Sequence, residues 1–487
     1  MTIREIIRIA VLKTNAWWPF RPINRWFYAL AINRFLAACR GFPEIRSIYL
    51  RHPLRAGQWT PALSDIDVTV VTDPQLGRNE EFAFLRKFWA RISRLQAIFP
   101  MLGEIEVLTE SSLETWVRFG MEGRGAGNWQ LLAGENRPAA PPAPSGVRYL
   151  REAFNYAFWF YLQDVTRVIA RGSAPAFLRR QDLLRLQRKI GRCIESMNAD
   201  YAEPASSGVP GRPGDAGLIL GMLEMLEIGL QATGLDEEQL LRAPSLREQF
   251  LLRQARASAE QEFGVDGSEM IDGVPEAIAS IYLDGRQQAF VILRSTANST
   301  GNRRAIEWAR DHFAAQDRSG VYLTERLFAY MLRFLNPFDH AWFIRQSECV
   351  HGERLLDEIS PPDMAAFEHN LLEQTPLLLL YAQSQEFLGP DKSAGSGQEF
   401  GIKWQQAAAL MVYLAHGEVQ ADPVRAVDRY GFLYPRQFAE FQAVQSLEYD
   451  PANALEHRRR FELLKNSTDD IRAALSANDS WEQVHWA

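Results

Sequence analysis

Apolar and polar residues alternate in three short segments of the first quarter of the chain. These segments are EIRSIYL (44–50), SDIDVTVV (64–71) and EIEVLT (104–109), and their β-branched residues are typical of strands. Between the second and the third, residues 79–99 place apolar side chains at helical spacing. NWQLLAG (128–134) follows as a further extended segment. The pattern predicts a small mixed α/β unit with a helix between two of its strands.

Longer amphipathic patterns dominate the remainder and predict helices. One exception is a β-hairpin predicted at 277–294, where two apolar runs flank a short polar turn. Segments rich in Pro, Gly or Ser read as linkers or exposed loops, at 134–146, 203–217 and 389–398. We identify no internal repeat in the sequence.

These boundaries predict an α+β protein in which a small mixed-sheet core precedes large, mostly α-helical regions. The expected parts are a basic, aromatic helical segment (1–40), an α/β core (41–134), a helical domain (147–265) and a mostly helical C-terminal region that carries the hairpin (268–487). A chain of 487 residues is too long for one compact core, which also favours several domains.

Two carboxylates interrupt the second strand segment, although strands disfavour aspartate. Side chains two apart on a strand share a face, so Asp65, Asp67 and Thr69 lie together while Ile66 and Val68 point into a core. Two like charges on one face repel unless a cation lies between them, and Mg²⁺ prefers such oxygen ligands. The simpler interpretation is a pair of solvated acids at a strand edge.

With these strands assigned, residues 48–107 resemble the nucleotidyltransferase superfamily, which includes DNA polymerase β and the aminoglycoside nucleotidyltransferases. The family has a strand, a Gly-Ser turn that opens a short helix, and then Asp-x-Asp on a second strand. Asp65 and Asp67 match the carboxylate pair, and Gly57 and Ser64 match a common glycine and serine. A third carboxylate belongs on a later strand. Glu106 fits best, with Glu104 as the alternative.

The resemblance implies transfer of a nucleoside monophosphate from a nucleoside triphosphate to a hydroxyl of a small molecule or protein. It implies two Mg²⁺ or Mn²⁺ ions held by Asp65, Asp67 and Glu106, which are then also the catalytic residues. The helices after residue 147 would form the far wall of the site, as in the aminoglycoside enzymes.

One departure from the family affects the nucleotide phosphates. Where the family has Gly-Ser, this chain has His52 and Pro53, and proline lacks the N–H that a phosphate would accept from. His52 and Arg55 are the candidates to replace those contacts by charge.

Two other functions are compatible with the same residues. A nucleotidyltransferase-like scaffold that has lost its phosphate turn would serve binding or assembly without catalysis. A nucleotide-sugar glycosyltransferase also uses Asp-x-Asp with a divalent ion, but such enzymes have several strands before the motif, and here only residues 44–50 precede it.

The composition limits the kinds of binding partner and the cellular compartment that we expect for this protein. The formal charge of −7 provides no general basic field for a long nucleic acid. Three widely spaced cysteines indicate neither a disulfide framework nor a metal site, so we expect a cytoplasmic protein. Residues 1–40 differ in composition from the rest of the chain, because they contain seven Lys or Arg residues, one acidic residue and many aromatic residues. We expect this segment to be a helix packed on the next domain, with membrane-surface contact as the alternative.

Overall fold

The computed structural model contains two compact units with separate cores. One, the inner unit, spans Pro144–Phe367, and the other, the outer unit, combines Thr2–Ala143 with Glu368–Ala487. The structure describes residues 3–51 (without 16 and 18), 65–110, 112–113, 117, 129–135, 146–170, 175–197, 214–240, 271–335 (without 272, 285–287 and 317), 347–352, 355 and 423–445, together with parts of 405–412 and 458–473.

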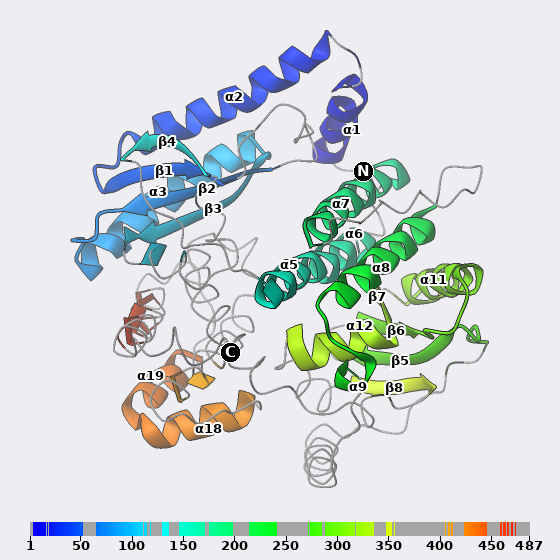
Figure 1. Cartoon of the computed structure of the whole chain (residues 1–487). Coiled ribbons are helices and arrows are strands. Elements are labelled where there is room, and N and C mark those ends of the chain that lie inside the picture. Colours follow the sequence, from blue (N-terminus) through cyan, green and yellow to red (C-terminus); the bar gives the residue numbers. More distant parts are fainter. Residues whose placement is uncertain are drawn as a thin grey trace. The chain divides into compact units, whose positions relative to one another are not determined.

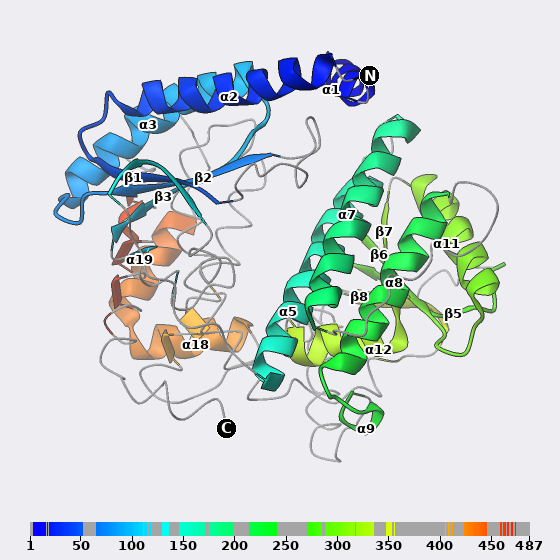
Figure 2. The same cartoon turned by 45° about the horizontal axis from the view of Figure 1, so that its top comes forward.

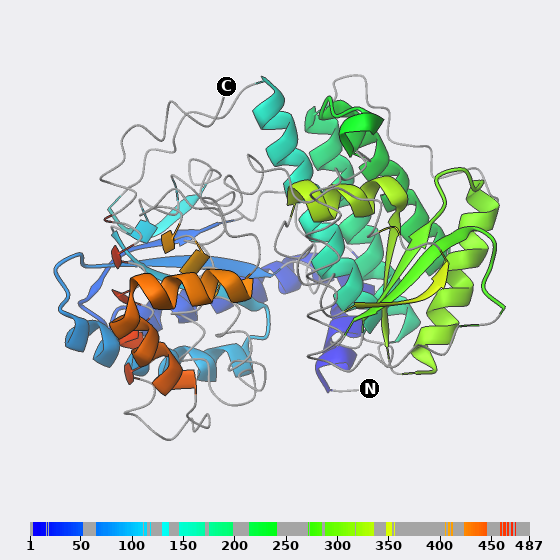
Figure 3. The ribbon, with the colours of Figure 1, turned by 90° about the horizontal axis from the view of Figure 1, so that it is seen from below.

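The outer unit is built on a four-stranded mixed sheet, the first sheet, with strand order β3-β2-β1-β4 (Figure 1). Strand β1 runs antiparallel to both β2 and β4, whereas β2 and β3 are parallel and are joined through helix α3. The elements are α1 (Ile3–Asn15), α2 (Phe20–Cys39), β1 (Ile45–Leu50), β2 (Ile66–Thr72), α3 (Arg78–Ile98), β3 (Leu102–Thr109), β4 (Gln130–Gly134), α18 (Pro423–Leu433) and α19 (Pro435–Gln445). Helices α18 and α19 follow one another directly and contact each other (Figure 3).

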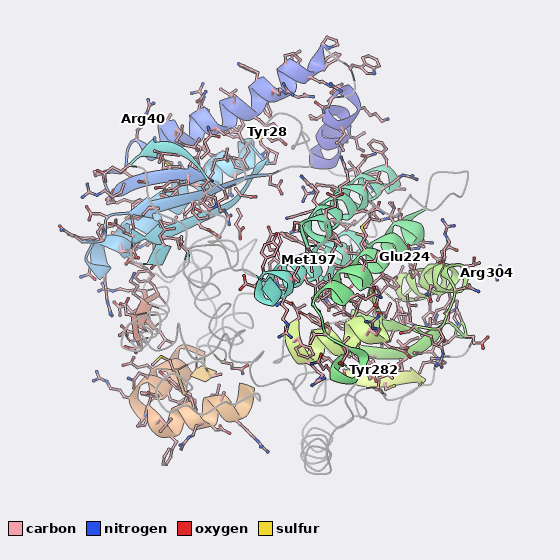
Figure 4. All side chains as sticks on the ribbon, viewed as in Figure 1. Tyr28, Arg40, Met197, Glu224, Tyr282 and Arg304 are labelled. Carbon is pink, nitrogen blue, oxygen red and sulfur yellow. The ribbon has the colours of Figure 1, made fainter. Side chains whose placement is uncertain are left out.

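Helices α2 and α3 cover one face of the first sheet (Figure 2). The strand residues that point to them are apolar and buried, among them Ile48, Val68 and Ile105. Tyr28 of α2 lies on the side of that helix that meets this core (Figure 4). Phe461, far along the chain, completes the same core. The opposite face of the sheet therefore carries the alternate residues of each strand.

The inner unit contains the second sheet, with strand order β7-β6-β5-β8, packed with helices into one large core. Its elements are α5 (Gly146–Phe160), the π-helical turn η2 (Tyr161–Val165), α6 (Thr166–Ala170), α7 (Ala176–Met197), α8 (Asp215–Ala232), α9 (Glu237–Leu240), β5 (Ile278–Asp284), β6 (Gln288–Leu293), α11 (Ser299–Ala314), β7 (Ser319–Thr324), α12 (Glu325–Tyr330), the π-helical turn η3 (Met331–Leu335) and β8 (Ser347–Gly352). Long helices α5, α7 and α8 pack against one another.

The two sheets have the same topology, which corrects the expectation of no internal repeat. In each, a central antiparallel pair is flanked by a strand parallel to one member and a strand antiparallel to the other. A helix joins the two parallel strands in both cases, α3 in the first sheet and α11 in the second. A helix that precedes the first strand in the chain also contacts the connecting helix in each unit, as α2 with α3 and α8 with α11.

The register of the antiparallel pairs agrees between the two sheets, whereas the parallel pair β2–β3 has an irregularity between Ile66 and Val68 that β6–β7 lacks. Strand β1 reads IRSIYL and β5 begins IASIYL, and both strands have irregularities after the first residue and at the Ile-Tyr step. At the same place in the pairing, Gly134 lies opposite Ser47 and Gly352 opposite Ser280, each glycine with positive φ. The chain therefore contains two copies of one α/β unit.

The domain boundary expected between residues 265 and 268 would separate residues that share one hydrophobic core. Helices α5, α7 and α8 and strands β5, β6 and β7 contribute to one buried cluster. The hairpin predicted at 277–294 corresponds to β5 and β6, which pair antiparallel as two of four strands. Residues 268–487 are not one region, because the chain from Glu368 onward belongs to the outer unit. Among the described helices, none is long and apolar enough to cross a membrane.

Cys39, at the end of α2, makes the stability of the outer unit depend on pH in the alkaline range. Burial raises the pKa of its thiol to about 12, against a smaller opposite effect of Arg91. Above the ordinary pKa of 9.0 the unfolded chain loses the proton that the folded chain keeps, so stability falls as the pH rises towards 12. Relative to Cys39→Ala, the wild type should lose about 1–2 kcal/mol between pH 9 and pH 10.5. Denaturant unfolding of both proteins at these pH values measures the difference, and parallel curves would contradict it.

Candidate active site

The carboxylates that the sequence singles out lie on the face of the first sheet opposite to α2 and α3. Strand β2 supplies Asp67, with Asp65 directly before it, and β3 supplies Glu104 and Glu106. Because β2 and β3 are parallel neighbours with Thr69 opposite Glu106, the two pairs are adjacent. We call these four residues the acidic face.

Asp65 and Asp67 approach each other over the backbone of Gly103. A Cβ atom on residue 103 would lie 2.6 Å from Asp65 Cβ and 2.6 Å from Asp67 Oδ1, so only glycine leaves room for both side chains there. Asp67 Oδ1 accepts a hydrogen bond of 3.0 Å from the backbone N–H of Glu104. Asp65 is exposed and Asp67 is half-buried. One Asp67 oxygen is thus anchored to β3.

Arg51, the residue after β1, pairs with both glutamates. Its Nη1 lies 2.8 Å from Glu106 Oε1 and its Nη2 lies 2.8 Å from Glu104 Oε2. The side chains of Arg51 and Glu106 are only 2% and 8% exposed. A buried carboxylate needs such compensation, since an unpaired buried charge is strongly unfavourable. Thr69 Oγ1 lies 3.4 Å from the second oxygen of Glu106.

The structure brings together all four acids that the sequence proposes as metal ligands. The other predicted contacts, at Ser64, His52, Arg55 and Gly57, lie outside the described residues.

Sequence reasoning did not identify Arg51 or Gly103. The alternation of β1 carries a signal for Arg51, because it lies two residues after Tyr49 and so shares a face with it and with the acids. Gly103 carries no such signal, since its role depends on where β3 lies beside β2.

The donor set suits a hard divalent cation only in part. Carboxylate oxygens are the ligands that Mg²⁺ and Mn²⁺ prefer, and Asp65 and Asp67 both lie beside Gly103. Glu106, however, is engaged by Arg51. Within the described parts of the chain, no group of three or more His, Cys, Asp or Glu side chains is arranged to hold a metal ion. A shared ligand at Glu106 requires Arg51 to move away.

The second sheet has the same strand order as the first sheet but has other residues at the positions of the acidic face. By register, Asp67 corresponds to Gln288 and Glu106 to Val321. Val321 is part of the core, and the ring of Tyr282 (labelled in Figure 4) stacks on Phe328 of α12 at 5.6 Å. The equivalent face is therefore closed by apolar packing. The acids of the first sheet are not needed to form the sheet.

No protein-family model, curated protein or solved structure matches this chain. The resemblance to nucleotidyltransferases thus rests on the residues and the geometry described above.

Proposed function

We propose that the acidic face of the first sheet is the site of a metal-dependent nucleotidyl transfer from a nucleoside triphosphate to a hydroxyl group. The observation that carries the proposal is the difference between the two copies of the unit. Strands of the same order and direction form with Gln288 and Val321 in place of Asp67 and Glu106, although β6–β7 lacks the irregularity that β2–β3 has between Ile66 and Val68. Because the fold does not require these acids, a chemical role is the better explanation for the cost of placing them there.

Asp65 and Asp67 would hold the metal ions that accompany the triphosphate. Glu106 would accept the proton of the hydroxyl as it attacks the α-phosphorus, and pyrophosphate would leave. When bound, Mg²⁺ or Mn²⁺ polarises the phosphoryl oxygens and lowers the pKa of that hydroxyl. Arg51 holds the Glu106 side chain in place before the substrate arrives. We place this activity in the cytoplasm, in line with three free cysteines.

The alternative is a binding scaffold that keeps the fold without the reaction. The pairing of Arg51 with Glu104 and Glu106 favours this alternative, because the charge of both glutamates is compensated by the chain itself. The replacement of Gly-Ser by His52 and Pro53 points the same way. A nucleotide-sugar glycosyltransferase is less well supported, since β1 is the one strand that the structure describes before Asp65.

A double substitution, Asp65→Asn with Asp67→Asn, separates metal-binding acids from structural ones. If the pair holds metal, the variant in EDTA should be as stable as the wild type or slightly more so, because repulsion between like charges is relieved. The wild type should gain stability with excess Mn²⁺, by about 2.7 kcal/mol at a hundredfold excess over the Kd, and the variant should not. Melting curves with EDTA, with Mn²⁺ and with Mn²⁺ plus ATP measure this.

The matched control is Asp428→Asn with Glu440→Gln, which removes two exposed acids from α18 and α19 of the same unit. It should keep the full response to Mn²⁺. A wild type that ignores both Mn²⁺ and ATP, together with a variant that melts early in EDTA, would establish a structural role and favour the scaffold.

A further inference from the structure

Exposed apolar side chains gather on the first turns of α2 and the turn before it. Trp17 and Trp26 are 66% and 63% exposed, and Phe20, Ile23 and Phe27 are exposed as well. With Ile6, they make up six of the nine exposed large apolar residues that the described part of the chain contains. We call residues 17, 20, 23, 26 and 27 the aromatic edge. An apolar cluster of this kind on a surface marks a site of interaction.

Most of the aromatic edge lies away from the side of α2 that packs on the sheet. Phe20, Ile23 and Phe27 follow a spacing of three and four residues, which places them on one side of the helix. Tyr28 and Phe35 lie on another side and are buried in the core. Helix α2 therefore has apolar residues on two sides. Phe27 lies at the boundary between them, since its ring centroid is 5.5 Å from that of the core residue Phe99.

Positive charge accompanies the aromatic edge. Arg21 and Arg25 are exposed and, with Pro22, Trp26 and Ala29, line a shallow hollow of the surface. No acidic residue occurs in the sequence between Glu5 and Glu44, although the whole chain has a net charge of −7. The segment is thus a basic and aromatic exception in an acidic protein.

We infer that the aromatic edge binds the surface of a lipid bilayer that contains anionic lipids, with the first half of α2 in the plane of the interface. Exposed tryptophan and phenylalanine rings favour the boundary between head groups and acyl chains. Arg21 and Arg25 are complementary in charge to anionic head groups. A second copy of the chain is the poorer partner, because it would bring the same unneutralised arginines against these two.

The first sheet separates this surface from the acidic face. Helix α2 packs with α3 on one face, whereas Asp65, Asp67, Glu104 and Glu106 belong to the other. An anionic surface would repel those carboxylates, and docking through α2 keeps them on the far side of the sheet. The inference does not depend on the proposed reaction, because no residue of the acidic face takes part.

Flotation of the full chain with vesicles tests the inference. We expect the wild type to float with vesicles of phosphatidylcholine and phosphatidylglycerol in a ratio of about 2:1, and much less with phosphatidylcholine alone. Replacement of Trp17 and Trp26 by alanine should weaken binding at least tenfold. Replacement of Arg21 and Arg25 by glutamine should abolish the preference for anionic vesicles, and salt should weaken the wild type in the same way.

Phe432→Ala is the matched control, because this ring is 76% exposed on α18 and lies outside the aromatic edge. It should bind as the wild type does. All of these residues are exposed, and unchanged melting temperatures confirm that the variants are folded. The inference is overturned if the wild type stays unbound, if Phe432→Ala binds as weakly as the tryptophan variant, or if that variant converts a dimer to a monomer, which would assign the edge to a second copy.

Discussion

Replacement of Arg51 by methionine should destabilise the outer unit by about 3–5 kcal/mol. The guanidinium of Arg51 is 2% exposed and bonds to Glu106, which is itself 8% exposed. Methionine keeps much of the apolar volume but leaves the carboxylate of Glu106 buried with no cation beside it. Urea unfolding followed by circular dichroism, analysed for the transition of this unit, measures the loss.

Two further variants show whether the effect comes from the uncompensated charge. Arg46→Met removes the arginine within β1, whose partner Asp73 is at the surface, and should cost less than about 1 kcal/mol. Arg51→Met combined with Glu106→Gln should recover most of the stability, because the buried charge is then absent. If Arg51→Met cost no more than Arg46→Met, Glu106 would not depend on Arg51 as described. In excess Mn²⁺, partial recovery of Arg51→Met alone would favour a metal ion at Glu106.

Alanine at Gly134 or at Gly352 should destabilise the unit that contains it by about 2–4 kcal/mol. Both glycines have positive φ, 89° and 79°. A Cβ would lie 1.9 Å from a backbone oxygen in each case, that of Arg46 for Gly134 and that of Ala279 for Gly352. The main chain of the neighbouring strand must move to relieve this overlap, which disturbs the pairing on both sides.

The control for these glycines is Gly234→Ala. Gly234 also has positive φ, 74°, but no atom lies within 4 Å of the position that its Cβ would take. This variant should therefore show the conformational strain alone, about 1 kcal/mol. Calorimetry should place the loss for Gly134→Ala and for Gly352→Ala in different unfolding transitions, since the two residues belong to different units. Equal losses in all three variants would mean that contact with the neighbouring strand contributes nothing.

Local patterns predicted the strands, the connecting helix and the shared face of the acids. The strand period of two places Asp67 and Glu106 correctly, because it depends only on the chain near each residue. The ion pair with Arg51 was accessible to the same reasoning, whereas the contact of Gly103 with Asp65 was not. That contact depends on the register between two strands that are separated by α3.

The internal repeat escaped the sequence because it lies in topology and pairing more than in residue identity. Apart from IRSIYL and IASIYL, the two copies share mainly apolar character, which many residues provide. The segment between the first two strands also differs in length, 15 residues between Leu50 and Ile66 against 3 between Asp284 and Gln288. No fixed period therefore marks the duplication. The shared core of the inner unit was missed for a similar reason, since contacts such as those of α6 and α8 with β7 leave no local signal.

The late contribution of the C-terminal residues to the outer unit has a consequence for synthesis on the ribosome. Phe461 completes the core under α2 and α3, and Lys465 forms a buried ion pair with Glu81, 384 positions earlier. A chain emerges from its N-terminus and folds by domains as they become complete. The inner unit has all its residues once Phe367 has emerged. The first sheet, although made earlier, must wait about 100 residues longer, with Glu81 uncompensated and the place of Phe461 open. The unit that is translated first is therefore the one that is finished last.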